Sequence, residues 1–171
     1  MEKITKQTLA ETTNYTEEDA RFMEMAIKLS EENVDNGGGP FGAVIVRDGE
    51  VISTGANRVV PNNDPTAHAE VTAIRNATAK LGTYDLSGCE IFTSCEPCPM
   101  CLGAIYWAHI DKIYYGNDRK DAAQIGFDYY FIYSELSLEP NERKLPCEIL
   151  MPQEAKNAFK MWTAKEDRTE Y

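Results

Sequence analysis

Two short segments of this 171-residue chain constrain its fold more than any other feature. His68 lies two residues before Glu70, and thirty residues after His68 the chain reaches Cys98, which follows Pro97 and precedes Cys101. Both segments stand where the surrounding pattern predicts that a helix begins. Imidazole nitrogen and thiolate sulfur are ligands that zinc prefers. One ion can therefore bind all three side chains only in a fold that brings two helix N-termini together across strands.

The spacing also predicts different roles for these side chains. Cys98 and Cys101 are three residues apart, so both fall on one face of a helix, whose positive N-terminal end favours thiolates. Glu70 diverges from His68 on a regular helix, so the two are not expected to bind one ion symmetrically. A catalytic zinc keeps three protein ligands and one position for water, whose pKa it lowers to about 7. We therefore predict that His68, Cys98 and Cys101 bind zinc and that Glu70 transfers protons to and from the water.

The cysteines leave other interpretations open at this point. Cys95 forms a second C-x-x-C with Cys98, and a closed site with four ligands would be structural, without a position for water. The pair could also be a redox pair, and the chain a zinc-stabilised interaction module without activity. Cys95 is predicted to be a small residue at a strand end, and Cys89 and Cys147 are predicted to be buried. His109, the other histidine of the chain, is interpreted as structural.

The order of the predicted elements favours an α/β fold with a mixed sheet covered by helices on both faces. The expected strands cover Phe41–Val46, Val51–Ala56, Glu90–Ser94, Lys112–Tyr115 and Cys147–Met151. The first two form a hairpin around Asp48-Gly49, and a loop follows over Pro61–Pro65. The expected helices run from a Thr16/Asp19 capping box to Asn36, from Pro65 to Gly82, from Pro97 to Ala108, and over Asp121–Gln124, Asp128–Leu136 and Gln153–Ala164.

The composition narrows the range of partners and locations. Lys and Arg number 17 and Asp and Glu number 28, so the net charge is −11. Such an acidic chain is poorly suited to the backbone of a nucleic acid or to an anionic membrane. No apolar stretch approaches the roughly 20 residues that span a bilayer, and the N-terminal segment has no signal-peptide core. We expect a cytoplasmic protein with reduced thiols and one domain over residues 1–171, in which residues 1–15 form a loose lead-in.

The two segments are parts of longer stretches that resemble the cytidine deaminase superfamily. Its zinc-dependent deaminases carry the pattern H-x-E…P-C-x-x-C. The stretches 64–75, 93–108 and 39–46 resemble this superfamily, and specifically its bacterial guanine deaminases, as do 121–128, 131–133 and the terminal Glu170-Tyr171. The later segments favour guanine deaminases over the tRNA adenosine and cytosine deaminases that share the zinc motif.

This resemblance implies a fold, a reaction and an assembly. The fold is a three-layer α/β/α arrangement with a mixed five-stranded sheet. One zinc ion per subunit is held by His68, Cys98 and Cys101, with Glu70 as the proton shuttle. The reaction is guanine plus water giving xanthine plus ammonia, a step of purine catabolism or salvage. The subunits form a homodimer in which the C-terminal segment, about residues 153–171, crosses to the partner's active site.

The resemblance also implies a substrate pocket, and there the sequence departs from the family pattern. The pocket residues that it implies are Phe41, Asn57, Trp107, Asp128 and Tyr171. Aromatic rings stack on a purine, and an Asn amide both donates to and accepts from a base edge. The family carries Asp-Asp after Gly-Phe, but here Tyr129 follows Asp128, so either the second acid is absent or Asp128 takes its role. Guanosine or an aminotriazine such as ammeline therefore stays an alternative substrate.

Overall fold

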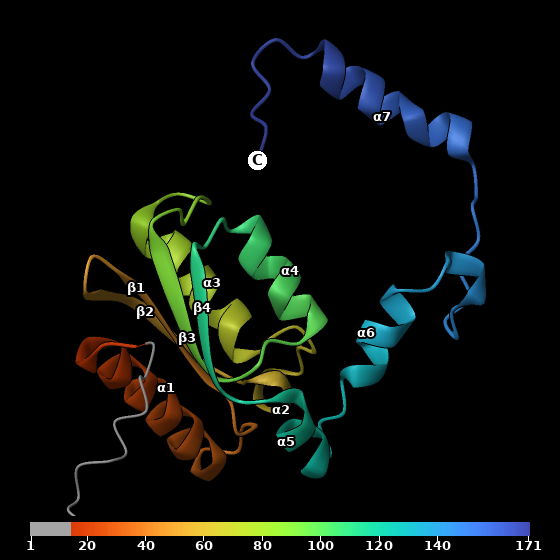
Figure 1. Cartoon of the computed structure of the whole chain (residues 1–171). Coiled ribbons are helices and arrows are strands. Elements are labelled where there is room, and N and C mark those ends of the chain that lie inside the picture. Colours follow the sequence, from red (N-terminus) through yellow and green to blue (C-terminus); the bar gives the residue numbers. More distant parts are fainter. Residues whose placement is uncertain (1–14) are drawn as a thin grey trace, which may run out of the picture. The chain divides into compact units, whose positions relative to one another are not determined.

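The computed structural model describes residues 15–171, so the predicted lead-in falls, apart from Tyr15, outside the described residues. The chain separates into two compact units, one ending at Asp118 and the other beginning at Arg119 (Figure 1). Each unit is described by itself below. That the whole chain acts as one domain stays a prediction.

The first unit is built on a mixed four-stranded sheet. Its strands are β1 (Gly42–Arg47), β2 (Glu50–Ala56), β3 (Cys89–Cys95) and β4 (Lys112–Asn117), in the order β2-β1-β3-β4. β1 runs antiparallel to both β2 and β3, whereas β3 and β4 are parallel. The hairpin turn between β1 and β2 falls on Asp48-Gly49, both with positive φ, as the dipeptide predicts. The parallel pair needs a crossover, which the helix α4 (Pro99–Trp107) provides.

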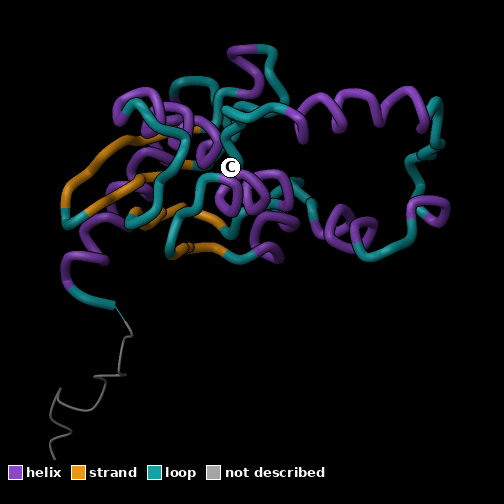
Figure 2. Tube along the Cα trace, turned by 90° about the horizontal axis from the view of Figure 1, so that it is seen from above, coloured by secondary structure: helices purple, strands orange, loops and turns teal. Residues whose placement is uncertain are grey.

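The alternation of side chains along β1 sends successive residues to opposite faces of this sheet. Val44 and Val46 join Phe22 and Ala26 of α1 (Glu17–Asp35) in one core. Ala43 and Ile45 face the other core, which contains the buried alanines of α3 (Ala69–Leu81) together with residues of α4 (Pro99–Trp107). Figure 1 shows α1 on one side of the strands and α3 and α4 on the other, and Figure 2 shows the strands (orange) with helices (purple) around them. The predicted three-layer α/β/α fold is confirmed.

Local sequence signals fix where the helices begin and how closely they pack. The Thr16 hydroxyl accepts from the Asp19 backbone N–H at 3.1 Å, and the Asp19 carboxylate accepts from the Thr16 N–H at 2.8 Å, which is the predicted capping box. α3 lies so close to β2 that a Cβ on Gly55 would stand 2.2 Å from the Ala69 carbonyl oxygen. The Ser53 hydroxyl donates to the Ala73 carbonyl at 2.7 Å. The first turns of α3, which carry Glu70, are thereby fixed against the sheet.

The second unit contains helices and connecting segments. These are α5 (Arg119–Gln124), α6 (Tyr130–Leu136), the 3-10 helix η1 (Pro140–Glu142) and α7 (Pro152–Ala164). The predicted strand over Cys147–Met151 is not formed, because its backbone finds no ladder partner among the described residues, and Ile149 is 89% exposed. The sheet consequently has four strands and not the five that the resemblance implied. Cys147 is exposed, so its predicted burial was wrong.

Two further findings complete the fold. A short helix, α2 (Val59–Asn62), replaces the first part of the predicted loop over Pro61–Pro65 and ends at Asn63 in the left-handed conformation. Between residues 15 and 171, no helix has both the length and the apolar character needed to cross a bilayer.

Candidate active site

His68 occupies the N-cap position of α3, at the end of a loop that several hydrogen bonds hold in place. The Asp64 carboxylate accepts from the Thr66 backbone N–H at 2.8 Å and from the Thr66 hydroxyl at 2.7 Å. The Ala67 carbonyl accepts from the Arg58 N–H at 2.8 Å, which ties this loop to the end of β2. The His68 side chain makes no capping hydrogen bond with its own helix. Its ring nitrogens therefore stay available for other ligands.

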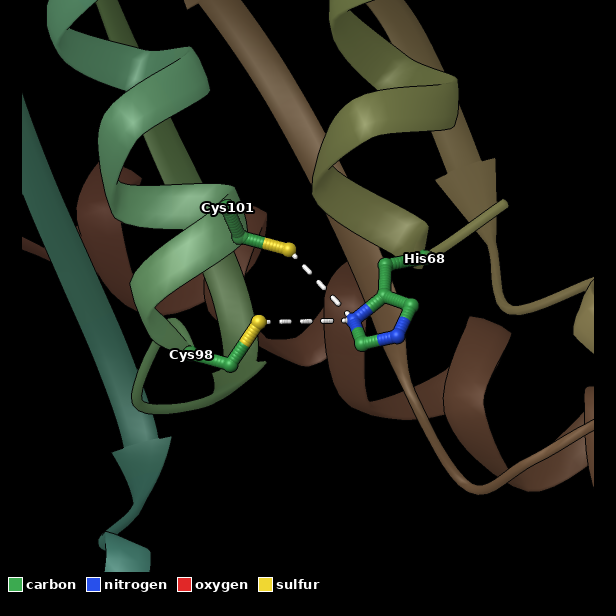
Figure 3. A group of neighbouring side chains, drawn as sticks. All are labelled: His68, Cys98 and Cys101. Atoms are coloured by element: carbon green, nitrogen blue, oxygen red, sulfur yellow. Dashed lines mark hydrogen bonds between the residues drawn. The ribbon is translucent and has the colours of Figure 1, made fainter. Parts of the chain in front are cut away.

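The two cysteines meet this histidine from the N-terminus of α4 (Figure 3). Cys98 is the N-cap residue and Cys101 lies in the first turn, as the three-residue spacing predicts. His68 Nδ1 lies 3.6 Å from Cys98 Sγ and 3.5 Å from Cys101 Sγ. The ligand atoms of the three residues all lie within 4.8 Å of one another. The fold thus brings together the three side chains that the sequence predicts as a metal centre.

The protonation of this cluster is strongly coupled. A hydrogen bond with the Cys101 thiol lowers the pKa of Cys98 to about 4, with a further contribution from His68. The same hydrogen bond, together with burial, raises the pKa of Cys101. The pKa of His68 is raised by its hydrogen bond with Cys98. In the absence of a metal the cluster therefore holds a Cys98 thiolate, stabilised by the neighbouring thiol and imidazole.

Glu70 lies two residues into α3, and only 6% of it is exposed. Burial raises the pKa of its carboxyl group, and the negative charge at Cys98 acts in the same direction. A hydrogen bond with Cys101 opposes this shift. A buried carboxyl group beside a metal centre, with a raised pKa, is suited to accept and return a proton.

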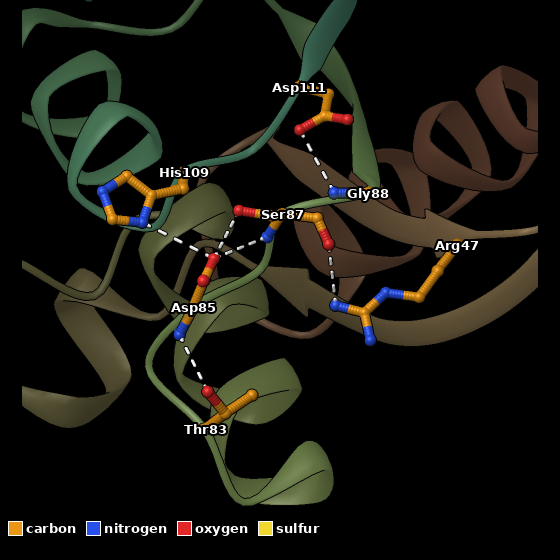
Figure 4. A network of polar contacts seen from close by, with 7 residues as sticks. All are labelled: Arg47, Thr83, Asp85, Ser87, Gly88, His109 and Asp111. Atoms are coloured by element: carbon orange, nitrogen blue, oxygen red, sulfur yellow. Dashed lines mark hydrogen bonds and ion pairs between the residues drawn. The ribbon is translucent and has the colours of Figure 1, made fainter. Parts of the chain in front are cut away.

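The remaining cysteine and histidine residues of the first unit lie outside the metal cluster. Cys95 is buried at the end of β3, as predicted, and its Sγ donates to the Asp118 carbonyl at 3.8 Å. Cys89 is buried in the core. His109 follows α4 with a positive φ, and its Nδ1 lies 3.5 Å from the Asp85 carboxylate in a polar network beyond the end of that helix (Figure 4). This position agrees with a structural role.

Three of the predicted pocket residues belong to the first unit. Asn57 follows β2 and is 6% exposed, and its backbone N–H donates to the Phe41 carbonyl at 3.1 Å. Phe41 precedes β1 and packs partly against the core. The fold therefore makes Asn57 and Phe41 neighbours. Trp107 is the last residue of α4 and is 65% exposed.

Asp128 and Tyr171, the other two predicted pocket residues, belong to the second unit. The Asp128 carboxylate accepts from the Tyr130 N–H at 3.0 Å at the start of α6. The ring of Tyr129 lies 6.4 Å from the ring of Tyr133. Tyr171 is 72% exposed. Their roles at the active site stay predictions.

One buried polar residue near Asn57 was missed by the sequence interpretation. Asn33, on α1, is 4% exposed and donates to the Asn57 carbonyl at 2.7 Å. A signal was present, since Asn33 continues the helical stripe of Phe22, Ala26 and Ser30 that faces the sheet. A polar residue on such a stripe is expected to have specific hydrogen-bond partners.

The sequence is similar to a known family and to curated proteins. Residues 16–117 match the family described as the cytidine and deoxycytidylate deaminase zinc-binding region. The guanine deaminase of Bacillus subtilis is 50% identical over 151 residues, which cover 88% of this chain and 97% of that protein. A tRNA-specific adenosine deaminase of Buchnera aphidicola is 34% identical over 145 residues, 83% of this chain and 94% of that protein.

Solved structures of guanine deaminases are also similar to this chain. The X-ray structure of the B. subtilis guanine deaminase matches with a TM-score of 0.86 at 49% identity and covers 89% of this chain and 98% of that one. The guanine deaminase from Nitrosomonas europaea matches with a TM-score of 0.63 at 38% identity, over 67% of this chain and 65% of that one. The family match includes His68, Glu70, Cys98 and Cys101 and spans more than half of the sequence. The chain belongs to the cytidine and deoxycytidylate deaminase family of zinc-binding enzymes.

Proposed function

We propose that the chain catalyses the hydrolytic deamination of guanine to xanthine and ammonia. The observation that carries the reaction type is the cluster of His68, Cys98 and Cys101 beside the buried Glu70. The choice of guanine rests on the B. subtilis guanine deaminase, which is more similar to this chain than the tRNA-specific adenosine deaminase of B. aphidicola. The net charge of −11 also counts against a nucleic acid as the substrate.

The distances in the cluster fit a zinc ion. Tetrahedral zinc with Zn–S of about 2.3 Å and Zn–N of about 2.0–2.1 Å places S and N about 3.6 Å apart. The separations of His68 Nδ1 from the two sulfur atoms are 3.6 and 3.5 Å. His68, Cys98 and Cys101 would hold one ion per subunit once both thiols are deprotonated and the imidazole is neutral. Zinc bound by these residues would lower the pKa of a water molecule and so supply the nucleophile at neutral pH.

Glu70 performs the proton transfers of the reaction. It accepts one proton from the attacking water and delivers it to N3 of guanine, the unprotonated ring nitrogen next to C2. The second water proton then goes to the 2-amino group as the C2–N bond breaks and ammonia leaves. Burial raises the pKa of Glu70, which strengthens its hold on the proton that it carries between the water and the base.

The residues around this centre would select the base. Asn57 offers an amide to the base edge, and Phe41 and Trp107 offer rings for stacking. We propose that Asp128 and Tyr171 complete the pocket and that the protein is a homodimer exchanging about residues 153–171. Exposed apolar side chains of the second unit, among them Ile149 (89%) and Phe159 (76%), support burial against another surface. The five free cysteines agree with a reducing cytoplasmic location.

Tyr129 favours one alternative in which the substrate is another aminopurine or a related heterocycle. Tyrosine provides a hydroxyl group where the family pattern has a carboxylate, so contacts to the amino-imine edge of the substrate would differ. The test is ammonia release from guanine, guanosine, adenine, cytosine and ammeline, with the zinc content measured on the same preparation. Guanine is expected to be the preferred substrate. If another compound is deaminated faster, that compound replaces guanine as the proposed substrate. If zinc-loaded protein deaminates none of the five compounds, the proposal that the chain is a deaminase is refuted.

A further inference from the structure

Asn33 forms a buried link between α1 and the two segments that follow β2 and precede β1. Its side-chain nitrogen Nδ2 donates to the carbonyl oxygens of Gly39 and Asn57, both at 2.7 Å. A primary amide has two N–H groups, so these two bonds use its full donor capacity. Its own carbonyl oxygen, Oδ1, accepts from the Arg58 guanidinium at 3.4 Å. Both polar atoms of this buried side chain are thus hydrogen-bonded to the segments that contain Gly39 and Asn57.

The backbone around Asn33 is shaped to permit these contacts. The Gly38 N–H donates to the Asn33 backbone carbonyl at 2.9 Å. A Cβ on Gly38 would stand 2.3 Å from Asn33 Nδ2 and 2.4 Å from the Asn57 carbonyl oxygen, so only glycine fits there. The Arg58 guanidinium also donates to the Asn36 carbonyl at 3.3 Å. The end of α1 and the segment after it are therefore closed around the amide of Asn33.

The two carbonyl groups that Asn33 holds lie in the segments that carry the proposed base contacts. Asn57 donates through its backbone N–H to the Phe41 carbonyl at 3.1 Å, and its side-chain oxygen accepts from the Val59 N–H at 3.3 Å. The next residue, Arg58, donates to the carbonyl of Ala67, which directly precedes His68, at 2.8 Å. A shift of the Asn57 backbone would consequently move Phe41 and Asn57 relative to the metal centre.

We propose that Asn33 is a positioning residue for base recognition, which fixes the placement of Asn57 and Phe41 through the carbonyl oxygens of Asn57 and Gly39. This inference rests on the proposed function, since it requires that Asn57 and Phe41 contact the base. Asn33 itself touches neither the metal ligands nor the substrate in this scheme. Its removal therefore acts on the affinity for the base and leaves the metal chemistry in place.

A positioning role and a merely structural role predict different kinetic changes. A structural defect lowers the folded fraction, which lowers the apparent kcat but leaves the KM of the remaining active molecules unchanged. Misplacement of Asn57 weakens a base contact in every molecule, so KM for guanine rises. A misplaced hydrogen bond to a base edge corresponds to a change of about 10-fold.

The experiment compares Asn33→Ser with the control Asn76→Ala. Asn76 also donates its side-chain amide to the backbone of another element, the Thr54 carbonyl of β2 at 2.9 Å, but it does not contact the Asn57 segment. Asn33→Ser is expected to raise KM for guanine about 10-fold with one zinc per chain retained, whereas Asn76→Ala leaves KM unchanged. An unchanged KM in folded Asn33→Ser refutes the proposal. Asn33→Asp, which preserves the side-chain volume but removes both N–H donors, provides the same measurement if the serine variant does not fold.

Asn57→Ala and the double variant separate this inference from the proposed function. If Asn33 acts through Asn57, the KM effect of the double variant is smaller than the product of the two single effects, and multiplicative effects refute the coupling. An effect of Asn57→Ala without any effect of Asn33→Ser refutes the positioning role alone. If Asn57→Ala leaves KM for guanine unchanged, the assignment of Asn57 to the base pocket is refuted, and the positioning role with it.

Discussion

The substitution Glu70→Gln tests the chemistry of the site most directly, because it removes a proton carrier and preserves its shape. Glu70 is 6% exposed, so bulk water has little access to replace it as acid and base. Positioned general acid–base groups contribute about 10²–10⁴-fold to a rate. This range corresponds to about 3–5 kcal/mol of transition-state stabilisation. We expect kcat for guanine to fall by at least about 100-fold, with the zinc content unchanged.

The direction in which Glu70→Gln changes the stability of the metal-free protein can also be predicted. Burial raises the pKa of Glu70 above its ordinary value of 4.5, so the folded state binds this proton more tightly than the unfolded state. The contribution of Glu70 to stability is therefore fully present below pH 4.5 and is lost as the pH rises through the folded pKa. Gln carries no such penalty. Metal-free Glu70→Gln is expected to be at least as stable as the unmodified protein at pH 7, by thermal unfolding.

The assay measures ammonia release, zinc by elemental analysis and thermal unfolding on the same samples. Glu90→Gln is the matched control, since Glu90 is a partly buried carboxylate near the start of β3, away from the helix N-termini that hold the metal cluster. It is expected to retain full turnover. If zinc-loaded Glu70→Gln keeps guanine turnover within about threefold of the unmodified protein, Glu70 is not the proton carrier.

Three further predictions concern the cysteines and the C-terminal residues. Cys98→Ser is expected to weaken zinc binding by more than about 100-fold, since a change of that size already follows from loss of a residue that only hydrogen-bonds to a metal ligand. Cys95→Ser is expected to retain zinc, and equal zinc loss in the two variants would overturn the three-ligand assignment. In metal-free protein, alkylation of Cys98 is expected to be nearly independent of pH between about pH 6 and 8, because its pKa is about 4, whereas in the denatured chain the rate rises with pH; mass-spectrometric peptide mapping measures both. Deleting Glu170 and Tyr171 is expected to lower guanine turnover about tenfold with little change in thermal unfolding, and full activity would exclude Tyr171 from the pocket.

The metal cluster was predictable from sequence because its determinants are local. Residue type, the three-residue spacing of Cys98 and Cys101 and the helix-start signals each act over a few residues. β2 and β3 both run antiparallel to β1, so their C-terminal ends, after which α3 and α4 begin, lie at the same edge of the sheet. The hairpin, the capping box and the alternating faces of β1 were predictable for the same reason.

The features that were missed depend on pairing over long distances. Ile149 and Leu150 have strand-forming sequence around them, yet a strand forms only where its backbone finds a partner, and sequence pattern does not provide the partner. Cys147 was expected to be buried from its residue type alone, but burial depends on what packs against it. Asn33 was missed for the same reason, because one of the two carbonyl groups that it binds belongs to Asn57, which the fold brings next to α1.

Two helix N-termini of the first unit, those of α3 and α4, lack the side-chain cap that α1 has. α1 begins at Thr16, whose side chain caps the helix, and such a cap stabilises a helix by about 0.5–2 kcal/mol. α3 and α4 begin at His68 and Cys98, and neither of these side chains makes a capping hydrogen bond. Both side chains turn instead toward each other across the site, at 3.6 Å. At these two positions a metal ligand stands where a Ser or Asp would stabilise the helix start, so at α3 and α4 the loss of a cap coincides with the residues that carry the chemistry.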